Sequence, residues 1–360
     1  MELGESIGTT EALRDILGCF VPDADSHSFV AIHSGFINDT FLVRKGSEPF
    51  YILQRINHEV FKDVDGLMGN IAKATKKLRA ADYRPMAVFP TMDGTPHAAL
   101  PSGHWRLLEY IPESITYDTT TDVAIAQEAG RLIGKFHLLM QGELPDDYCD
   151  TLPQFHDLEL RYAQYQQALK DTTPERLTLA EQALQKVDAI YAHLQQGRPE
   201  KLPLRVCHND TKLNNILFSK DTGKALCLID LDTLMRGYFH YDFGDAVRII
   251  ANTAPEDEKN LQLISFHKER FTAFVAGLAM HGPLLGKEEL EALPYGTILM
   301  PFLHGIRALT DYLNFDAYYK ITYPTQNLDR ALSLLRFSEI AMAAEPYMST
   351  TVKQRLMPLE

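Results

Sequence analysis

Residues 207–232 read CHNDTKLNNILFSKDTGKALCLIDLD. Two apolar runs, NNILF and ALCLID, flank the polar segment SKDTGK. This pattern predicts a β-hairpin with a two-residue turn at Thr222-Gly223. Counting back from that turn along two antiparallel strands places Asn215 opposite Asp230. Both residues are then expected at the open end of the hairpin, where the HND segment enters it.

A loop carboxylate (Asp210), an amide oxygen (Asn215) and a strand carboxylate (Asp230) are therefore expected to converge. Mixed carboxylate and amide oxygens suit Mg²⁺, which keeps several waters and takes further ligands from phosphates. An aspartate beside such a metal can orient and deprotonate an attacking hydroxyl. The alternative is that HND is an ordinary polar turn and Asp230 a solvated strand end. The agreement of spacing, chemistry and pairing favours the catalytic interpretation.

Composition narrows the class of protein. The 360 residues are 45% hydrophobic and carry a net charge of −13, which argues against extended binding to nucleic acid or to an anionic membrane. A small anionic ligand remains compatible, because a few placed cations and backbone amides suffice to bind it. The four cysteines form no CxxC pair and are predicted to be reduced thiols. The N-terminus lacks a basic leader and no apolar run approaches a membrane span, so we expect a cytoplasmic protein with no obligate protein partner.

The order of patterns along the chain predicts two lobes. An expected amphipathic helix over residues 1–20 precedes the β-rich runs SFVAI, DTFLVRK, PFYILQRI, MAVFPTM and HWRLLEYI, and one helical pattern at 58–80 interrupts them. Beyond EYIPES, helical patterns dominate. We therefore expect a β-rich lobe at 1–108, a connection at 109–113 and a mainly helical lobe at 114–360. The expected helices of the second lobe lie at residues 122–141, 155–197, 256–281, 297–314 and 326–347.

The catalytic stretch resembles a known family. His208-Asn-Asp-Thr-Lys-Leu-Asn-Asn215 resembles the H-x-D-x-x-x-x-N catalytic loop of the kinase fold. With LIDLDT and YDFGD, the sequence is similar to the aminoglycoside phosphotransferase and choline kinase superfamily, and most similar to bacterial N-acetylhexosamine 1-kinases. The likeness extends to YILQRIN (51–57), AGRLIGKFH (129–137) and RALTDYLNFDAYYKITYPTQN (307–327). It implies an α+β, bilobal protein-kinase-like fold that transfers phosphate from Mg-ATP to the anomeric hydroxyl of an N-acetylhexosamine or related hexose.

The resemblance also implies roles for individual residues. Asp210 would be the catalytic base, and Asn215 and Asp230 the Mg²⁺ ligands. Lys212 would face the transferring phosphoryl group and offset its charge. The first lobe would bind the nucleotide, and the segment Leu108–Ile111 would connect the lobes. In that segment the backbone C=O of Glu109 and the N–H of Ile111 would hydrogen-bond adenine.

A second motif, Asp242-Phe243-Gly244, spells the metal-binding tripeptide of protein kinases. The hairpin already supplies a metal aspartate in Asp230, so the tripeptide is predicted to have another role. We expect Asp242 to hydrogen-bond the catalytic loop or to cap a helix that begins near Ala246.

Two features depart from the protein kinase pattern. The phosphate-covering turn is expected in IHSGFINDT (residues 32–40), which contains one glycine. Its backbone amides and side chains could cradle phosphates, although a plain hairpin turn explains it equally well. Gln54 stands on the third strand where kinases have a phosphate-pairing lysine, and the helical glutamate that would pair with that lysine is unidentified. The residues assigned to the turn are Ser34, Gly35, Asn38 and Thr40.

The acceptor is expected to contact the helical lobe. His304, Arg307 and Asp311 form one polar stripe on an apolar helix, which indicates either a sugar-binding wall or an Arg307–Asp311 surface pair. By resemblance, Arg307 and Tyr318 contact the hexosamine and Phe36 overhangs it, although a polar residue would be expected in place of Phe36. Aminoglycoside, choline and homoserine are the alternative acceptors. A catalytically silent kinase-fold binding protein is the alternative from another functional class.

Overall fold

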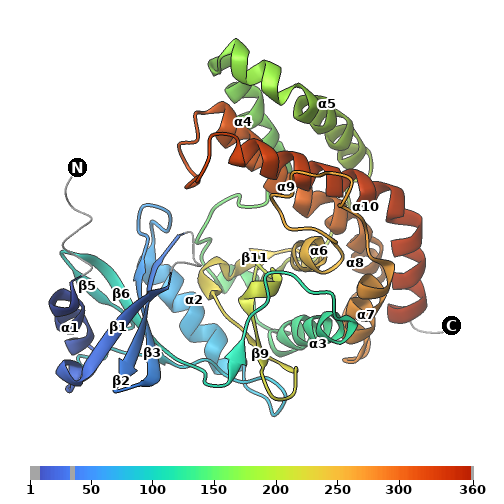
Figure 1. The fold of residues 1–360 in the computed structure, drawn as a ribbon. Coiled ribbons are helices and arrows are strands. Elements are labelled where there is room, and N and C mark those ends of the chain that lie inside the picture. The colour runs from blue at the N-terminus through green and yellow to red at the C-terminus, as the bar shows by residue number, and fades with distance from the viewer. Residues whose placement is uncertain (1–8, 33–36, 358–360) are drawn as a thin grey trace.

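The computed structural model describes residues 9–32 and 37–357. The first part of the chain forms an antiparallel sheet in the order β1-β2-β3-β6-β4, with β5 paired to β6. Figure 1 shows this sheet and α1 on one side of the molecule and most helices on the other. The elements are α1 (Thr10–Gly18), β1 (His27–Ile32), β2 (Asp39–Lys45), β3 (Glu48–Ile56), α2 (Val64–Lys77), β4 (Val88–Phe89), β5 (Ala98–Leu100) and β6 (Gly103–Glu109).

The sheet has a small core of its own. Leu13 and Leu17 of α1 pack with Val43, Leu53 and Trp105 of the strands, all of them nearly inaccessible to solvent. Alternation along each strand sends these apolar residues to one face and the neighbouring residues to the other. As a result Gln54 of β3 lies directly opposite Arg106 of β6, with both side chains on the same face of the sheet.

Helix α2 follows the sheet in sequence but packs with the second part of the chain. Asp63 caps it by accepting a hydrogen bond from Gly66 N–H at 2.8 Å. Its buried apolar residues, such as Leu67 and Ile71, belong to the large core that runs through the helical part. Asn70 fixes this attachment, since its side chain donates to the backbone carbonyls of Cys149 and Leu234 at 2.8 and 2.9 Å.

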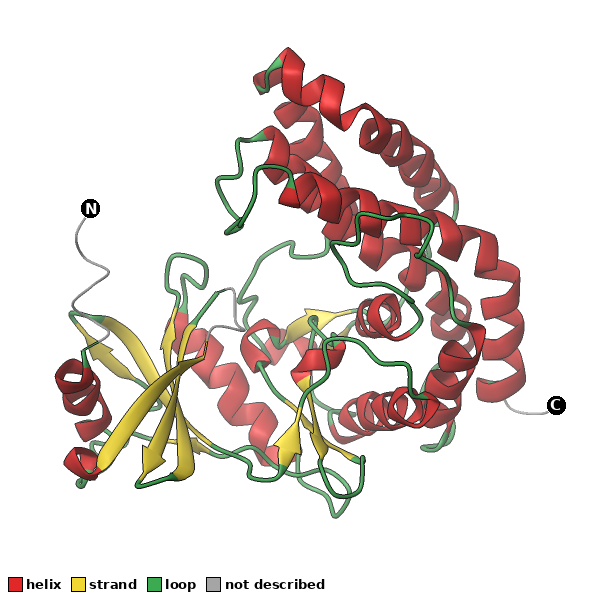
Figure 2. Cartoon of the chain, in the orientation of Figure 1, coloured by secondary structure: helices red, strands yellow, loops and turns green. Residues whose placement is uncertain are grey.

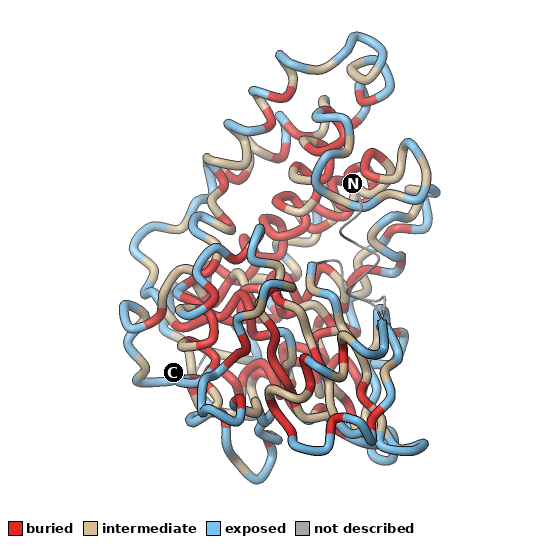
Figure 3. Tube along the Cα trace, turned by 90° about the vertical axis from the view of Figure 1, so that its left-hand side faces the viewer, coloured by how far each residue is buried: buried red, intermediate tan, exposed pale blue. Residues whose placement is uncertain are grey.

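The rest of the chain is mainly helical, with short strands near the middle of the molecule, as Figure 2 shows. The buried segments concentrate in the body of the molecule, while the outer loops are exposed (Figure 3). The strands are β7 (Ser114–Ile115), β8 (Arg205–Cys207), β9 (Ile216–Ser219), β10 (Ala225–Leu228) and β11 (Met235–Gly237). The helices are α3 (Val123–Leu139), α4 (Leu158–Asp171), α5 (Pro174–Gln196), α6 (Phe239–Ile250), α7 (Lys268–Ala279), α8 (Lys287–Glu291), α9 (Leu293–Leu313) and α10 (Gln326–Leu356).

Two glycines allow α6 to lie against α9. A Cβ atom on Gly244 would lie 2.0 Å from the Gly296 carbonyl oxygen, and one on Gly296 would lie 2.1 Å from the His240 carbonyl oxygen. Any larger residue would therefore force the helices apart. The glycine of the DFG sequence thus serves a helix crossing.

The predicted fold class is confirmed: an antiparallel sheet followed by a mainly helical part, as in kinase-like proteins. Three helix predictions were wrong in detail. The pattern at 155–197 is two helices, because Pro174 begins a new one. The pattern at 256–281 is helical only from Lys268, and the helix expected near Ala246 begins at Phe239. Over the residues that the structure describes, no helix combines the length and apolarity that a membrane span requires.

Candidate active site

The hairpin that carries the site differs by one residue from the predicted register. β9 pairs with β10 so that Ile216 lies opposite Leu228, and a β-bulge interrupts the ladder between Ala225 and Cys227. The predicted two-residue turn is wrong: Ser219 N–H donates to the Lys224 carbonyl at 2.9 Å, so four residues form the loop and Ala225 lies opposite Phe218, two positions from the predicted register. The extra residue of the bulge on β10 recovers one of these two positions. The backbone C=O of Asn215 consequently accepts a hydrogen bond from Ile229 N–H at 2.9 Å, and the predicted pairing with Asp230 is wrong.

The three expected residues nevertheless lie together. The Asn215 side-chain amide donates to the backbone C=O and the Oδ2 of Asp210, both at 2.8 Å. Asp230 follows Ile229 in the left-handed backbone conformation, with φ of 61°, which is uncommon for a residue other than glycine. Its carboxylate lies close enough to Asp210 for the two charges to interact. Backbone strain of this kind is found most often at functional sites.

Asp210 is held ionised by its neighbours. Burial, the largest single effect, raises the pKa of its carboxyl, but the charge of Lys212, the hydrogen bond from Lys212 and the charge of His208 together outweigh it, so the pKa lies below the ordinary value. The Lys212 Nζ lies 2.8 Å from Asp210 Oδ2. Burial lowers the pKa of Lys212, whereas Asp210 and Asp230 raise it to above the ordinary value. The carboxylate and the ammonium group therefore both keep their charges at neutral pH.

Asp230 is in a less favourable environment. Burial, then the charges of Asp232 and Asp210, raise the pKa of Asp230 to about 6, against the opposing effects of Lys212 and Arg106. An excess of buried negative charge at this point would be relieved by a cation. The oxygen donors of Asn215 and Asp230 are of the type that Mg²⁺ prefers, so the chemistry of the donor set fits this ion.

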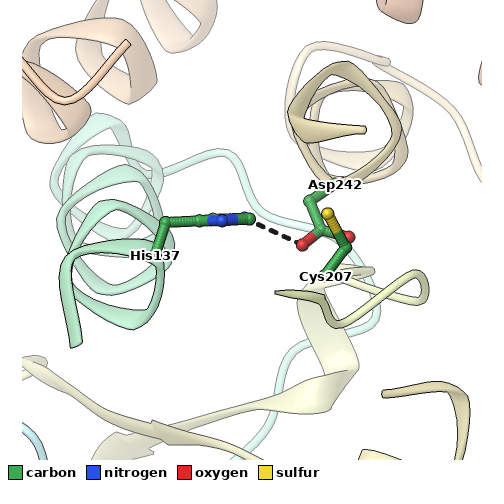
Figure 4. A group of neighbouring side chains, drawn as sticks. All are labelled: His137, Cys207 and Asp242. Atoms are coloured by element: carbon green, nitrogen blue, oxygen red, sulfur yellow. Dashed lines mark hydrogen bonds and ion pairs between the residues drawn. The ribbon is translucent and has the colours of Figure 1, made fainter. Parts of the chain in front are cut away.

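Asp242 anchors the catalytic loop. Its carboxylate accepts hydrogen bonds from His208 N–H and Asn209 N–H at 2.9 and 2.7 Å, which confirms the predicted bond to the catalytic loop. His137 Nε2 lies 2.9 Å from the same carboxylate, as Figure 4 shows. His137, Cys207 and Asp242 could in principle hold a metal ion, since their ligand atoms lie within 4.8 Å of one another. However, burial raises the pKa of the Cys207 thiol well above its ordinary value and Asp242 already has three partners, so the group is structural.

An ion pair between Arg106 of β6 and Asp232 links the sheet to the active site. Both side chains are 2% exposed, and the Arg106 Nη1 donates to Asp232 Oδ1. The other oxygen of Asp232 accepts a hydrogen bond from the Asn38 side chain at 2.7 Å. Gln54 accepts from Arg106 Nε at 3.0 Å and donates to the Thr40 hydroxyl at 3.0 Å. The side chains of Asn38, Thr40 and Gln54 are thus engaged in this network.

Of the other residues predicted to bind the nucleotide, the structure describes Glu109 and Ile111. Ser34, Gly35 and Phe36 lie outside the described residues. Glu109 ends β6, and its side chain forms an ion pair with Arg84 at 2.9 Å. Within the described part of the chain, the backbone N–H of Ile111 makes no hydrogen bond. A free amide at this position suits the predicted contact with adenine, which stays a prediction.

The three residues of the predicted polar stripe on α9, His304, Arg307 and Asp311, lie in different environments. His304 Nε2 lies 3.2 Å from Asp245 Oδ1, and burial lowers the pKa of His304 to about 3, so this imidazole is neutral. Arg307 lies over the ring of Phe155, with 5.0 Å from the guanidinium carbon to the ring centroid. The next residue, His156, lies with its Nε2 2.9 Å from the Asn209 carbonyl oxygen. Arg307 is therefore connected to the catalytic loop through one short segment.

Both interpretations of Asp311 were wrong. It is buried, and its carboxylate accepts hydrogen bonds from Tyr318 N–H and Tyr319 N–H at 2.8 and 2.9 Å and from Asn327 at 2.9 Å. It forms no ion pair with Arg307 among the described residues. Asp311 thus positions the segment that carries Tyr318, a residue that is 58% exposed.

Sequence reasoning overlooked Arg106, Asp232 and Asp245. Asp245 is fully buried and lies near Asp210, where the Arg248 and His304 side chains bind it. One signal was present in the sequence: Arg106 is a lone cation within the apolar strand run HWRLLEYI. A charged side chain in such a run is rarely buried unless a partner compensates it. That partner was not evident because it is distant in sequence.

Comparison with known proteins identifies relatives across most of the chain. Residues 28–274 match the family described as "Phosphotransferase enzyme family". A segment of 64 residues is 39% identical to an aminoglycoside 3′-phosphotransferase of Streptomyces ribosidificus, and it spans 18% of this chain and 24% of that enzyme. Among solved structures, a microcompartment-associated aminopropanol kinase is similar with a TM-score of 0.60 at 18% identity, covering 95% of this chain and 98% of that one. An amicoumacin kinase in complex with AMP-PNP, Ca²⁺ and Ami is similar with a TM-score of 0.58 at 16% identity, covering 98% of this chain and 96% of that one.

These findings confirm the superfamily inferred from the catalytic loop, and the structural likenesses establish the fold. The narrower similarity to N-acetylhexosamine 1-kinases stays a prediction.

Proposed function

The chain belongs to the phosphotransferase enzyme family, and from this premise we propose that it is a small-molecule kinase that uses Mg-ATP. Its proposed acceptor is the anomeric hydroxyl of an N-acetylhexosamine, GlcNAc or GalNAc, or of a related hexose. The observation that carries the kinase assignment is the position of Asp210, ionised and in contact with Lys212 and Asn215. The sugar assignment rests on the likeness of residues 307–327 to N-acetylhexosamine 1-kinases.

The proposed roles divide the chemistry among four residues. Asn215 and Asp230 would hold Mg²⁺, which when bound neutralises charge on the phosphate oxygens. Asp210 would accept the proton of the acceptor hydroxyl, for which its low pKa keeps it in the correct protonation state. Lys212, already 2.8 Å from Asp210, would offset the negative charge of the phosphoryl group during transfer.

The charges beside Phe155 favour a neutral acceptor over a cationic one. Arg307 stacks on this ring, and burial together with the charge of Arg307 lowers the pKa of Arg161 to about 10. Two neighbouring guanidinium groups repel the ammonium groups of choline or an aminoglycoside. Their N–H groups can instead donate to sugar hydroxyl and carbonyl oxygens, which supports the sugar assignment.

The substrate proposal is tested by an acceptor screen with Mg-ATP. It compares N-acetylglucosamine, N-acetylgalactosamine, other hexoses, homoserine, choline and an aminoglycoside, and NMR of the product locates the phosphate. We expect turnover on a hexose or N-acetylhexosamine, with the phosphate on the anomeric oxygen. Turnover on choline or an aminoglycoside and on no sugar would refute the acceptor class and leave the kinase assignment intact.

Replacement of Arg307 tests the acceptor site separately. Arg307→Gln is expected to raise the acceptor KM about 10- to 100-fold, since it removes a charged hydrogen-bond donor from the proposed sugar contact. The KM for ATP should not change. Arg336→Gln is the matched control, because Arg336 lies on α10 in a partly exposed pair with Glu339. An equal effect of the two substitutions, or an effect on ATP alone, would contradict the proposed role of Arg307.

A catalytically silent binding protein is the second candidate, motivated by the absence of the third-strand lysine. Calorimetric titration with Mg-ATP combined with the acceptor screen separates the two candidates. Binding of nucleotide without transfer to any acceptor would favour the binding protein. The pairing of Asp210 with Lys212 supports the enzyme, because a binding protein has no use for an ionised base.

A further inference from the structure

The buried guanidinium group of Arg106 lies beside the active site, and none of the roles proposed above uses it. We propose that Arg106 binds the phosphates of the nucleotide, in the place of the lysine that kinases carry on the third strand. This inference rests on the proposed use of ATP and deepens it, because it assigns a phosphate-binding residue to a strand other than the one expected.

The position of Arg106 follows from the register of the sheet. Gln54 occupies the lysine position on β3, and Arg106 lies directly opposite it on β6. Paired residues of neighbouring strands point to the same face of a sheet. The guanidinium group therefore reaches the region that a lysine at position 54 would occupy. It also lies near enough to Asp230 for its charge to lower the pKa of that carboxyl.

The ion-pair partner of Arg106 takes the place of a glutamate that protein kinases have and this chain lacks. In protein kinases, a glutamate of the helix after the third strand pairs with the lysine. Helix α2 holds no glutamate in its sequence VDGLMGNIAKATKK. Asp232, two residues after the proposed metal ligand Asp230, forms the corresponding buried ion pair with Arg106. The ion pair that positions the cation therefore joins β6 to the end of the hairpin, whereas in protein kinases it joins β3 to the following helix.

The remaining hydrogen bonds leave one part of the guanidinium group available. Arg106 Nε donates to Gln54 Oε1 at 3.0 Å and Nη1 donates to Asp232. Within the part of the chain that the structure describes, no residue accepts a hydrogen bond from Nη2. This nitrogen is also not fully buried, so it remains accessible. The planar group is fixed at two donors and can offer the third to a phosphate oxygen. In this arrangement Gln54 orients the arginine.

The test measures how strongly the chain prefers ADP to adenosine. Calorimetric titrations of the full chain without divalent metal give the ratio of the two affinities, to which only the protein's own phosphate contacts contribute. Arg106→Gln should lower this ratio about 10- to 100-fold by weakening ADP binding, the range for a hydrogen bond to a charged group. The affinity for adenosine should not change. Arg55→Gln is the matched control, because it removes an arginine–aspartate pair from the neighbouring position of β3.

Two further variants separate phosphate binding from a purely structural ion pair. The double variant Arg106→Gln/Asp232→Asn avoids an unpaired buried carboxylate, so it remains usable if Arg106→Gln fails to fold. It should show the same loss of preference for ADP, whereas Asp232→Asn alone should keep the preference, since the cation is still present. An unchanged ratio in both Arg106 variants, or an equal loss in Asp232→Asn, would overturn the inference while leaving the proposed function in place. Failure of the wild-type chain to bind either ligand would instead refute the use of ATP and the inference with it.

Discussion

Asp210→Asn is expected to lower kcat by about 10²- to 10⁴-fold, because the amide keeps the shape of the side chain but cannot accept the proton of the acceptor. The affinity for Mg-ATP should be unchanged or slightly tighter, since the substitution removes a negative charge that faces the phosphates. Initial rates at saturating ATP and acceptor, with a separate nucleotide titration, measure the two quantities. Asp188→Asn is a suitable control, because Asp188 is an exposed residue of α5 that accepts a hydrogen bond from Tyr162. Turnover within about threefold of wild type would remove Asp210 from its catalytic role.

The second large effect is expected from Asp230→Ala. Loss of this carboxylate removes a charged ligand from the proposed Mg²⁺ site, so activity should collapse and higher Mg²⁺ should restore part of it. The melting temperature without nucleotide should not fall. Burial and neighbouring carboxylates raise the pKa of Asp230 to about 6, so its charge is unfavourable in the folded protein and its removal is not expected to destabilise it.

Asp242→Asn gives the opposite expectation and serves as the comparison. An asparagine can replace one acceptor of the buried carboxylate but not both, so a backbone N–H of His208 or Asn209 loses a charged acceptor. The cost is about 1–3 kcal/mol of unfolding free energy. We expect a lowered melting temperature and an activity loss that added Mg²⁺ does not restore. Rescue by Mg²⁺ at Asp242, together with a loss of stability alone at Asp230, would make the literal DFG aspartate the metal ligand.

Local patterns were sufficient for much of the active site. The spacing in HNDTKLNNILF brought Asp210 and Asn215 together, because a loop that enters a strand leaves little freedom over so few residues. The hairpin also delivered Asp230 close to them, although its predicted register was wrong. The four-residue turn displaces the pairing by two positions and the β-bulge restores one of them. The left-handed residue Asp230 follows directly after the paired strand, and its carboxylate still reaches the site.

Hydrophobic alternation and short-range spacing are local properties, so the residues alone predicted the main strands, the catalytic loop and the family. The pairing of polar side chains that are distant in sequence depends on how the elements pack, and only the folded chain reveals it. Packing paired Arg106 with Asp232, directed the Asp311 carboxylate to the backbone of the Tyr318 segment, and decided between the two roles expected of Asp242. Each of these carboxylates is buried, and a buried charge persists only where the fold supplies a donor. Those donors come from segments brought together by packing, and no local pattern specifies them.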